Sequence, residues 1–168
     1  MKIASHVRSS AAAMCVLLLT AALSTALAQQ KEKSVDELAK ESDVVAVGRV
    51  TALKSEWDAG KTRIITRVSL AVDEYLKAGN ERSKTVTIVT LGGEVEGVGE
   101  VYTHVPTFRQ SESVVVMLRK DNRGDYRVSG GTQGKYSIER NLENGRLTVA
   151  GGVAVDDFTT SIKQSVNK

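Results

Sequence analysis

The clearest hydrophobic pattern in the chain is an alternation that begins at Ile64. Every second residue from Ile64 to Val72 is apolar or threonine, whereas the residues between them are mainly polar or small. A period of two is typical of a strand with one face against a core. Residues 43–57 form a second β-branched run, and a turn at 58–61 separates the two runs, so the sequence predicts a β-hairpin. Gly48 predicts a bulge or bend in its first strand.

Further strands follow at hairpin spacing. We expect them at 85–91, at 113–119 and in three short segments that begin near Tyr126, Lys135 and Leu147. The 113–119 segment is almost wholly apolar, which predicts a strand buried on both faces. Between these strands, residues 92–100 contain four glycines, so we expect a mobile loop that leads into a short strand near Val101.

Two segments have the period of a helix instead. Ser34 and Glu37 form a capping box, which predicts a helix of about two turns after Ser34. Near the carboxyl end, apolar residues recur at intervals of three and four from Val155 to Val166, which predicts an amphipathic helix over 155–167.

These elements predict the fold class. About seven strands in hairpins, with no alternation of strands and helices, favour a mainly β domain. We expect a small antiparallel OB-like barrel, or a sandwich, with a short N-terminal helix and a C-terminal helix packed on it.

The first 28 residues have the organisation of an export signal. A basic stretch with Lys2 and Arg8 precedes an apolar run over 11–23, and a small-x-small cleavage pattern ends at Ala28. We therefore expect a signal peptide over 1–28, a polar lead over 29–33 and one domain over 34–168. The product should be periplasmic or extracellular, with no membrane span after cleavage. Cys15 lies inside the signal, so the mature chain would have no cysteine.

Charge changes little once the signal is set aside. The chain has 23 basic and 20 acidic residues, and Lys2 and Arg8 are the only charged residues of the signal. The remaining chain therefore has one more basic than acidic side chain. Nucleic-acid binding relies on a clustered basic face, so we expect no nucleic-acid partner.

Candidate reactive groups are few. His104 is the only histidine after the signal, and no Gly-x-Ser-x-Gly motif accompanies it. Glu94, Glu96 and Glu100 cluster in the glycine-rich segment, but valines separate them, unlike the closely spaced ligands of a calcium loop. We therefore predict no catalytic residue, no bound metal and no cofactor.

These observations favour a non-enzymatic, exported binding or interaction module whose partner is an unknown protein or small ligand. Long loops on a rigid sheet often carry binding functions. The alternatives are a protease inhibitor acting through residues 92–108 and a hydrolase that uses His104. The predicted contact surface comprises Trp57, Gly92, Gly93, Glu94, Val95, Val98, Tyr102, His104 and Phe108.

Several segments carry a family resemblance. Residues 42–50, Trp57, residues 64–77, and the later segments 92–95 and 133–136 resemble a family of small exported bacterial proteins of unassigned function. The opening strand also loosely resembles netrin-like and metalloprotease-inhibitor modules, which implies an OB-type barrel. Those inhibitors place an N-terminal cysteine on a zinc ion. A mature chain beginning at Gln29 has no cysteine, so the resemblance does not extend to that mechanism.

Overall fold

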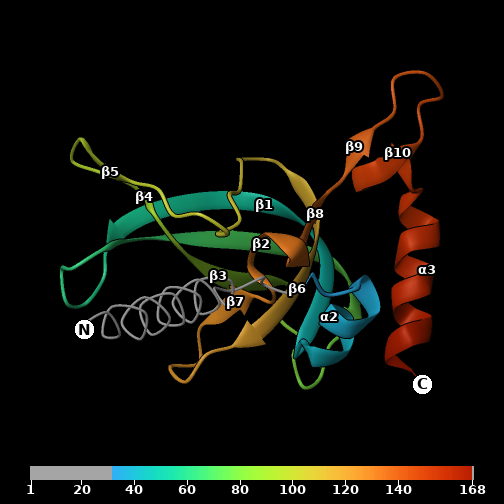
Figure 1. The fold of residues 1–168 in the computed structure, drawn as a ribbon, viewed down its shortest axis with the longest axis horizontal. Coiled ribbons are helices and arrows are strands. Elements are labelled where there is room, and N and C mark those ends of the chain that lie inside the picture. The colour runs from blue at the N-terminus through green and yellow to red at the C-terminus, as the bar shows by residue number, and fades with distance from the viewer. Residues whose placement is uncertain (1–31, 168) are drawn as a thin grey trace, which may run out of the picture. The chain divides into compact units, whose positions relative to one another are not determined.

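The computed structural model describes residues 32–167, and the predicted export signal lies outside these residues. The described part is mainly β, with ten strands and two α-helices in the order shown in Figure 1. The elements are α2 (Val35–Glu41), β1 (Val44–Trp57), β2 (Ile64–Lys77), β3 (Thr85–Leu91), β4 (Gly93–Val95), β5 (Val98–Glu100), β6 (Ser113–Lys120), β7 (Tyr126–Val128), η1 (Gly131–Gly134), β8 (Lys135–Ser137), β9 (Glu139–Arg140), β10 (Leu147–Thr148), η2 (Ala150–Gly152) and α3 (Val155–Val166).

Five strands close into a barrel, which confirms the predicted fold class. The order is β1-β2-β3-β7-β6, and β1 closes the ring by pairing with β6. All of these pairs are antiparallel except β3 with β7, which meet in parallel at Ile88 and Tyr126. β8 adds a further strand on the free edge of β6.

β1 bends where it pairs with both β2 and β6. Its pairing with β2 shifts register at three places, one of them between Val47 and Gly48, as the sequence predicted. Gly48 is also required for the close approach of β2, because a Cβ atom there would lie 2.3 Å from the Ala71 carbonyl oxygen.

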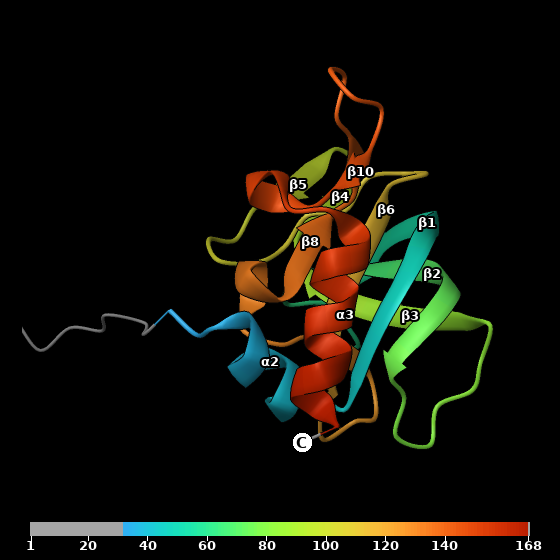
Figure 2. The same cartoon turned by 90° about the vertical axis from the view of Figure 1, so that its right-hand side faces the viewer.

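The two faces of β6 explain its apolar sequence. Val114, Val116 and Leu118 belong to the core inside the barrel. Val115 and Met117 point outward and pack in a second core that includes Leu38 of α2 and Ile162 of α3. The two helices lie side by side over this outer face (Figure 2). The prediction that both faces of this strand are buried is confirmed.

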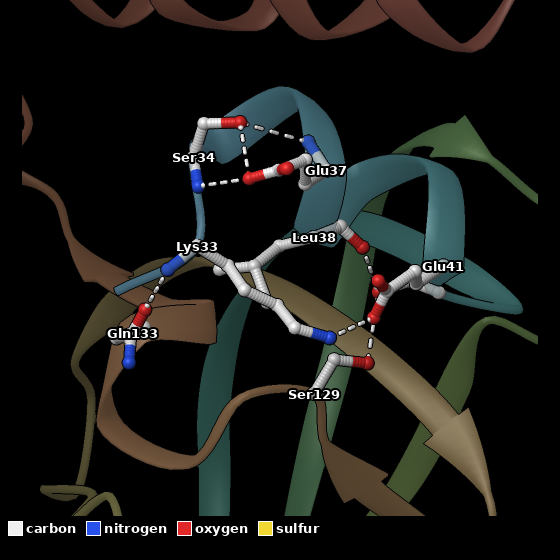
Figure 3. Close-up of polar contacts among 8 residues, drawn as sticks. Lys33, Ser34, Glu37, Leu38, Glu41, Ser129 and Gln133 are labelled. Carbon is white, nitrogen blue, oxygen red and sulfur yellow. Dashed lines mark hydrogen bonds and ion pairs between the residues drawn. The ribbon is translucent and has the colours of Figure 1, made fainter. Parts of the chain in front are cut away.

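The capping box at the start of α2 forms as the sequence predicted (Figure 3). The Glu37 amide donates to Ser34 Oγ at 3.2 Å, and the Ser34 amide donates to Glu37 Oε2 at 2.9 Å. At the other end of α2, the Ser42 hydroxyl lies 2.6 Å from the Leu38 carbonyl oxygen and 2.8 Å from the Ser129 hydroxyl. These contacts fix the short helix to the segment after β7.

One element differs from the expectation. The glycine-rich segment forms the β4–β5 hairpin, in which Gly93 pairs with Glu100 and Val95 with Val98, where we expected a mobile loop. In Figure 1 this hairpin projects at one end of the long β1–β2 hairpin, and the β9–β10 hairpin projects near α3. None of the helices in residues 32–167 combines the length and the apolar character that crossing a membrane would require.

Candidate functional site

The barrel has an open mouth because β1 and β2 extend beyond the strand that closes it. The pairing of β1 with β6 ends at Arg49 and Ser113, whereas the pairing of β1 with β2 continues to Trp57 and Ile64. Beyond Arg49, β1 therefore has β2 as its neighbour but no longer pairs with β6.

A pocket of about 470 Å³ fills this mouth, and we call it the mouth pocket. Its floor comes from β1, β2 and β3, and its roof from residues 92–108. The floor residues are Leu53, Ser55, Thr66, Val68, Thr90 and Leu91; the roof residues are Gly92, Gly93, Glu94, Gly99, Glu100, Val101, Tyr102, Val105, Pro106, Thr107 and Phe108. The lining is mainly apolar with a few hydroxyls and carboxylates, which is the usual composition of a small-molecule or side-chain site.

Hydrogen bonds fasten the roof to the start of β2. Glu100 Oε2 accepts from the Ile64 amide at 2.8 Å and from the Tyr102 hydroxyl at 2.9 Å. The Thr66 hydroxyl donates to the Gly92 carbonyl oxygen at 2.7 Å, and the Gly92 amide donates to the Ile64 carbonyl oxygen at 2.8 Å. The bond to Glu100 also raises the pKa of the Tyr102 hydroxyl, which favours its neutral, donating form.

The two glycines at the turn from β3 to β4 allow this close contact. Gly93 has φ +130°, and a Cβ atom there would lie 2.4 Å from Ser55 Oγ and 2.5 Å from Thr66 Oγ1. Gly92 has φ +90°, and its Cβ atom would lie 2.7 Å from the Glu100 carbonyl oxygen. A side chain at either position would push the roof away from the floor.

A buried ion pair lies behind Phe108, one of the roof residues of the pocket. Lys135 Nζ lies 2.6 Å from Glu112 Oε1 and 5.1 Å from the centre of the Phe108 ring. Ser137 donates to the same Glu112 oxygen at 2.6 Å. Burial tends to raise the pKa of Glu112, but the bonds from Lys135 and Ser137 outweigh it and lower that pKa. Phe108 is therefore held by a charged pair that β8 anchors.

The structure brings together five of the nine predicted contact residues. Gly92, Gly93, Glu94, Tyr102 and Phe108 all line the mouth pocket.

The other four lie outside the lining. Trp57 is half-buried and pairs with Ile64 at the end of the β1–β2 hairpin. Val95 and Val98 pair near the tip of the β4–β5 hairpin. His104 is exposed with φ +60°, and its carbonyl oxygen packs against Gly131. In the part of the chain that the structure describes, its imidazole takes part in no hydrogen bond or ion pair.

The floor of the pocket is what sequence reasoning missed. The alternation predicts that Thr66 and Val68 face the core of the sheet, and Ser55 pairs with Thr66 on the neighbouring strand. The available signal was a pair of hydroxyl residues at core-facing positions of neighbouring strands. Fully buried positions seldom carry two such groups, so the pair marks the place where the core opens to solvent.

The described residues contain no group of three or more histidine, cysteine, aspartate or glutamate side chains placed to bind a metal ion. The chain matches no protein-family model, and a search of curated proteins finds no similar sequence.

Proposed function

We propose that this chain is an exported, non-enzymatic binding module that takes an apolar group of its partner into the mouth pocket. The observation that carries the proposal is the mouth pocket together with the exposed apolar residues around it. Seven large hydrophobic side chains are exposed in residues 32–167, and three of them line this pocket. These three are Leu53 of the floor and Val101 and Tyr102 of the roof.

Three polar groups of the pocket are already engaged in hydrogen bonds within it. Glu100, Tyr102 and Thr66 are hydrogen-bonded within the roof and floor. They therefore hold the shape of the pocket, and the exposed apolar side chains supply the contact area. A preformed pocket of this kind binds an aliphatic or aromatic group without a large rearrangement.

The test uses an apolar fluorescent probe and two matched variants. Leu53→Glu places a carboxylate in the floor of the mouth pocket, whereas Leu142→Glu places one on the β9–β10 hairpin, where Leu142 is 97% exposed. We expect Leu53→Glu to weaken probe binding at least about tenfold, the loss that about 1.4 kcal/mol produces. Leu142→Glu should leave it unchanged. Equal binding by both variants would contradict the proposal.

A second candidate, a protease inhibitor acting through residues 92–108, is favoured by one observation. Val101 is 96% exposed, although its neighbours Glu100 and Tyr102 are joined by a hydrogen bond. A segment whose backbone is already ordered loses little conformational entropy when its exposed side chain inserts into a protease cleft. Titration of exported proteases with the chain, and with its Val101→Asp variant, tests this function; inhibition by both alike, or by neither, would exclude it.

A further inference from the structure

A polar hollow lies on the β6–β7 hairpin. It shares no lining residue with the mouth pocket. Arg119 of β6 pairs directly with Arg127 of β7. Like charges in directly opposed positions of an antiparallel pair destabilise the sheet. The hairpin therefore places two guanidinium groups side by side, where an anion between them would reduce their repulsion.

The only carboxylate that lines this hollow is that of Asp121, and both of its oxygens already accept hydrogen bonds from the hairpin. Asp121 Oδ2 accepts from Arg127 Nε at 2.8 Å. Asp121 Oδ1 accepts from the amides of Arg123 and Asp125 at 2.8 and 3.1 Å. Asp121 therefore pairs with the guanidinium group of Arg127 and forms no ion pair with that of Arg119.

Arg119 has no such partner. It is exposed, and within residues 32–167 its side chain forms no hydrogen bond or ion pair. Lys120 adds a third positive charge, with its amine 4.9 Å from the centre of the Tyr126 ring. These cations, with Asn122, line one hollow of about 450 Å³.

Neighbouring acidic residues do not supply the missing charge. Asp125, in the turn of the same hairpin, pairs with Arg67 at 3.6 Å. Asp43 and Glu81 line a separate hollow, which shares only Lys120 with the first. Asp43 accepts from the Lys120 amide at 2.8 Å, and Glu81 accepts from the Tyr126 hydroxyl at 3.0 Å. The side of the hairpin that carries Arg119 and Arg127 is therefore left with excess positive charge.

We infer that this hollow binds an oxyanion, a phosphate or sulfate group, between Arg119 and Arg127. Guanidinium groups form paired, charge-assisted hydrogen bonds to such groups, and two of them can share one tetrahedral anion. The bound anion would also remove the repulsion between the two arginines. The Asn122 amide would supply a further donor.

The experiment titrates the purified chain with inorganic phosphate, and separately with inorganic sulfate, at constant ionic strength set with chloride. Amide shifts of residues 119–128 in NMR spectra report occupancy. We expect saturable shifts in this hairpin. Arg119→Gln should weaken binding at least about tenfold, because a hydrogen bond to a charged group is lost, and Arg119→Lys should fall between this variant and the wild type.

Arg146→Gln is the matched control, because Arg146 is an exposed arginine on the β9–β10 hairpin and the substitution makes the same change in net charge. It should bind as the wild type does. The anion could be a free ion or a group carried on a polymer, and a sulfated oligosaccharide tested in parallel distinguishes the two. Tighter binding than that of inorganic sulfate indicates a polymer-borne group, whereas equal binding indicates the free ion. Shifts that do not saturate, or equal loss in Arg119→Gln and Arg146→Gln, would overturn the inference.

Discussion

Single residues decide how the roof of the mouth pocket meets its floor. Gly93 brings the backbone of β4 against the hydroxyls of Ser55 and Thr66, which are 2.9 Å apart. A positive φ and an absent Cβ are both needed at this position. The glycines of this segment therefore serve a close packing contact as well as a turn.

Gly93→Ala should lower the free energy of unfolding by at least about 2 kcal/mol, because the new methyl group collides with two hydroxyls and φ is strained. Gly99→Ala is the control. It lies on the partner strand β5, and a Cβ atom there would meet nothing within 4 Å. This control should change the free energy by less than about 1 kcal/mol. Urea unfolding measures both, and equal midpoints would show that the contact at Gly93 is unimportant.

Glu81 makes stability depend on pH. Hydrogen bonds from the Ser83 side chain and amide, then from Tyr126, lower the pKa of Glu81 from 4.5 to about 2. A lowered folded-state pKa stabilises the fold above the unfolded-state pKa, and that stabilisation is lost as the pH falls through the folded-state value. The contribution should thus be complete above about pH 5 and disappear toward pH 2.

Unfolding free energies of the wild type and Glu81→Gln between pH 7 and pH 2 test this dependence. The difference between the two proteins should shrink over the acidic part of the range. Glu143→Gln, a change at an exposed carboxylate in the tip of the β9–β10 hairpin, should show no such convergence. A difference between wild type and Glu81→Gln that stays constant with pH would contradict the assignment.

At the scale of elements, β8 connects the barrel to the roof through Lys135. The side chains of Lys135 and Glu112 are only 11% and 8% exposed, whereas those of the ion pair between Lys163 of α3 and Glu74 of β2 are 43% and 49% exposed. Removing one partner of a buried pair leaves an uncompensated charge, while an exposed pair contributes little.

Lys135→Gln should therefore lower the free energy of unfolding by about 3 kcal/mol. Lys163→Gln should lower it by less than about 1 kcal/mol. Because Lys135 also lies over Phe108, its replacement should weaken probe binding in the mouth pocket, which Lys163→Gln should not do. Thermal or chemical unfolding together with probe fluorescence measures both effects. Similar losses for the two variants would refute the structural role of Lys135.

The elements also show how far the sequence could predict this protein. The alternation in β2, the apolar run of β6, the capping box before α2 and the apolar spacing of α3 each report a local arrangement, so they were predictable. The β4–β5 hairpin was missed because its strands are three residues long and rich in glycine, and a tertiary contact holds them. The pocket floor was missed because a core-facing position next to an opening has the same alternation as any other.

At the scale of the whole molecule, the unequal length of its strands creates the site. β1 and β2 have 14 residues each, whereas β6 has eight and β7 three, so the barrel is closed at one level and open at another. The two helices cover the outer face of β1 and β6, and the mouth is left to the roof segment. The helices thus cover one side of the described barrel and leave the mouth, where we propose that a partner binds, uncovered by them.

Export is the prediction that belongs to the whole chain. Cleavage after Ala28 should leave a mature protein that begins at Gln29 and has no cysteine. N-terminal sequencing and intact mass of the protein recovered from the periplasm or medium measure this directly. A product that retains Met1, or one confined to the cytoplasm, would contradict it.

The central claim is that the mouth pocket is where this protein binds its partner, and backbone NMR mapping with a panel of small aliphatic and aromatic compounds tests it most directly. We predict that the amide shifts will concentrate at Leu53, Thr66, Gly93, Tyr102 and Phe108. Shifts that concentrate instead on the β9–β10 hairpin, where Leu142 and Leu147 are exposed, or no shifts with any compound, would contradict the claim.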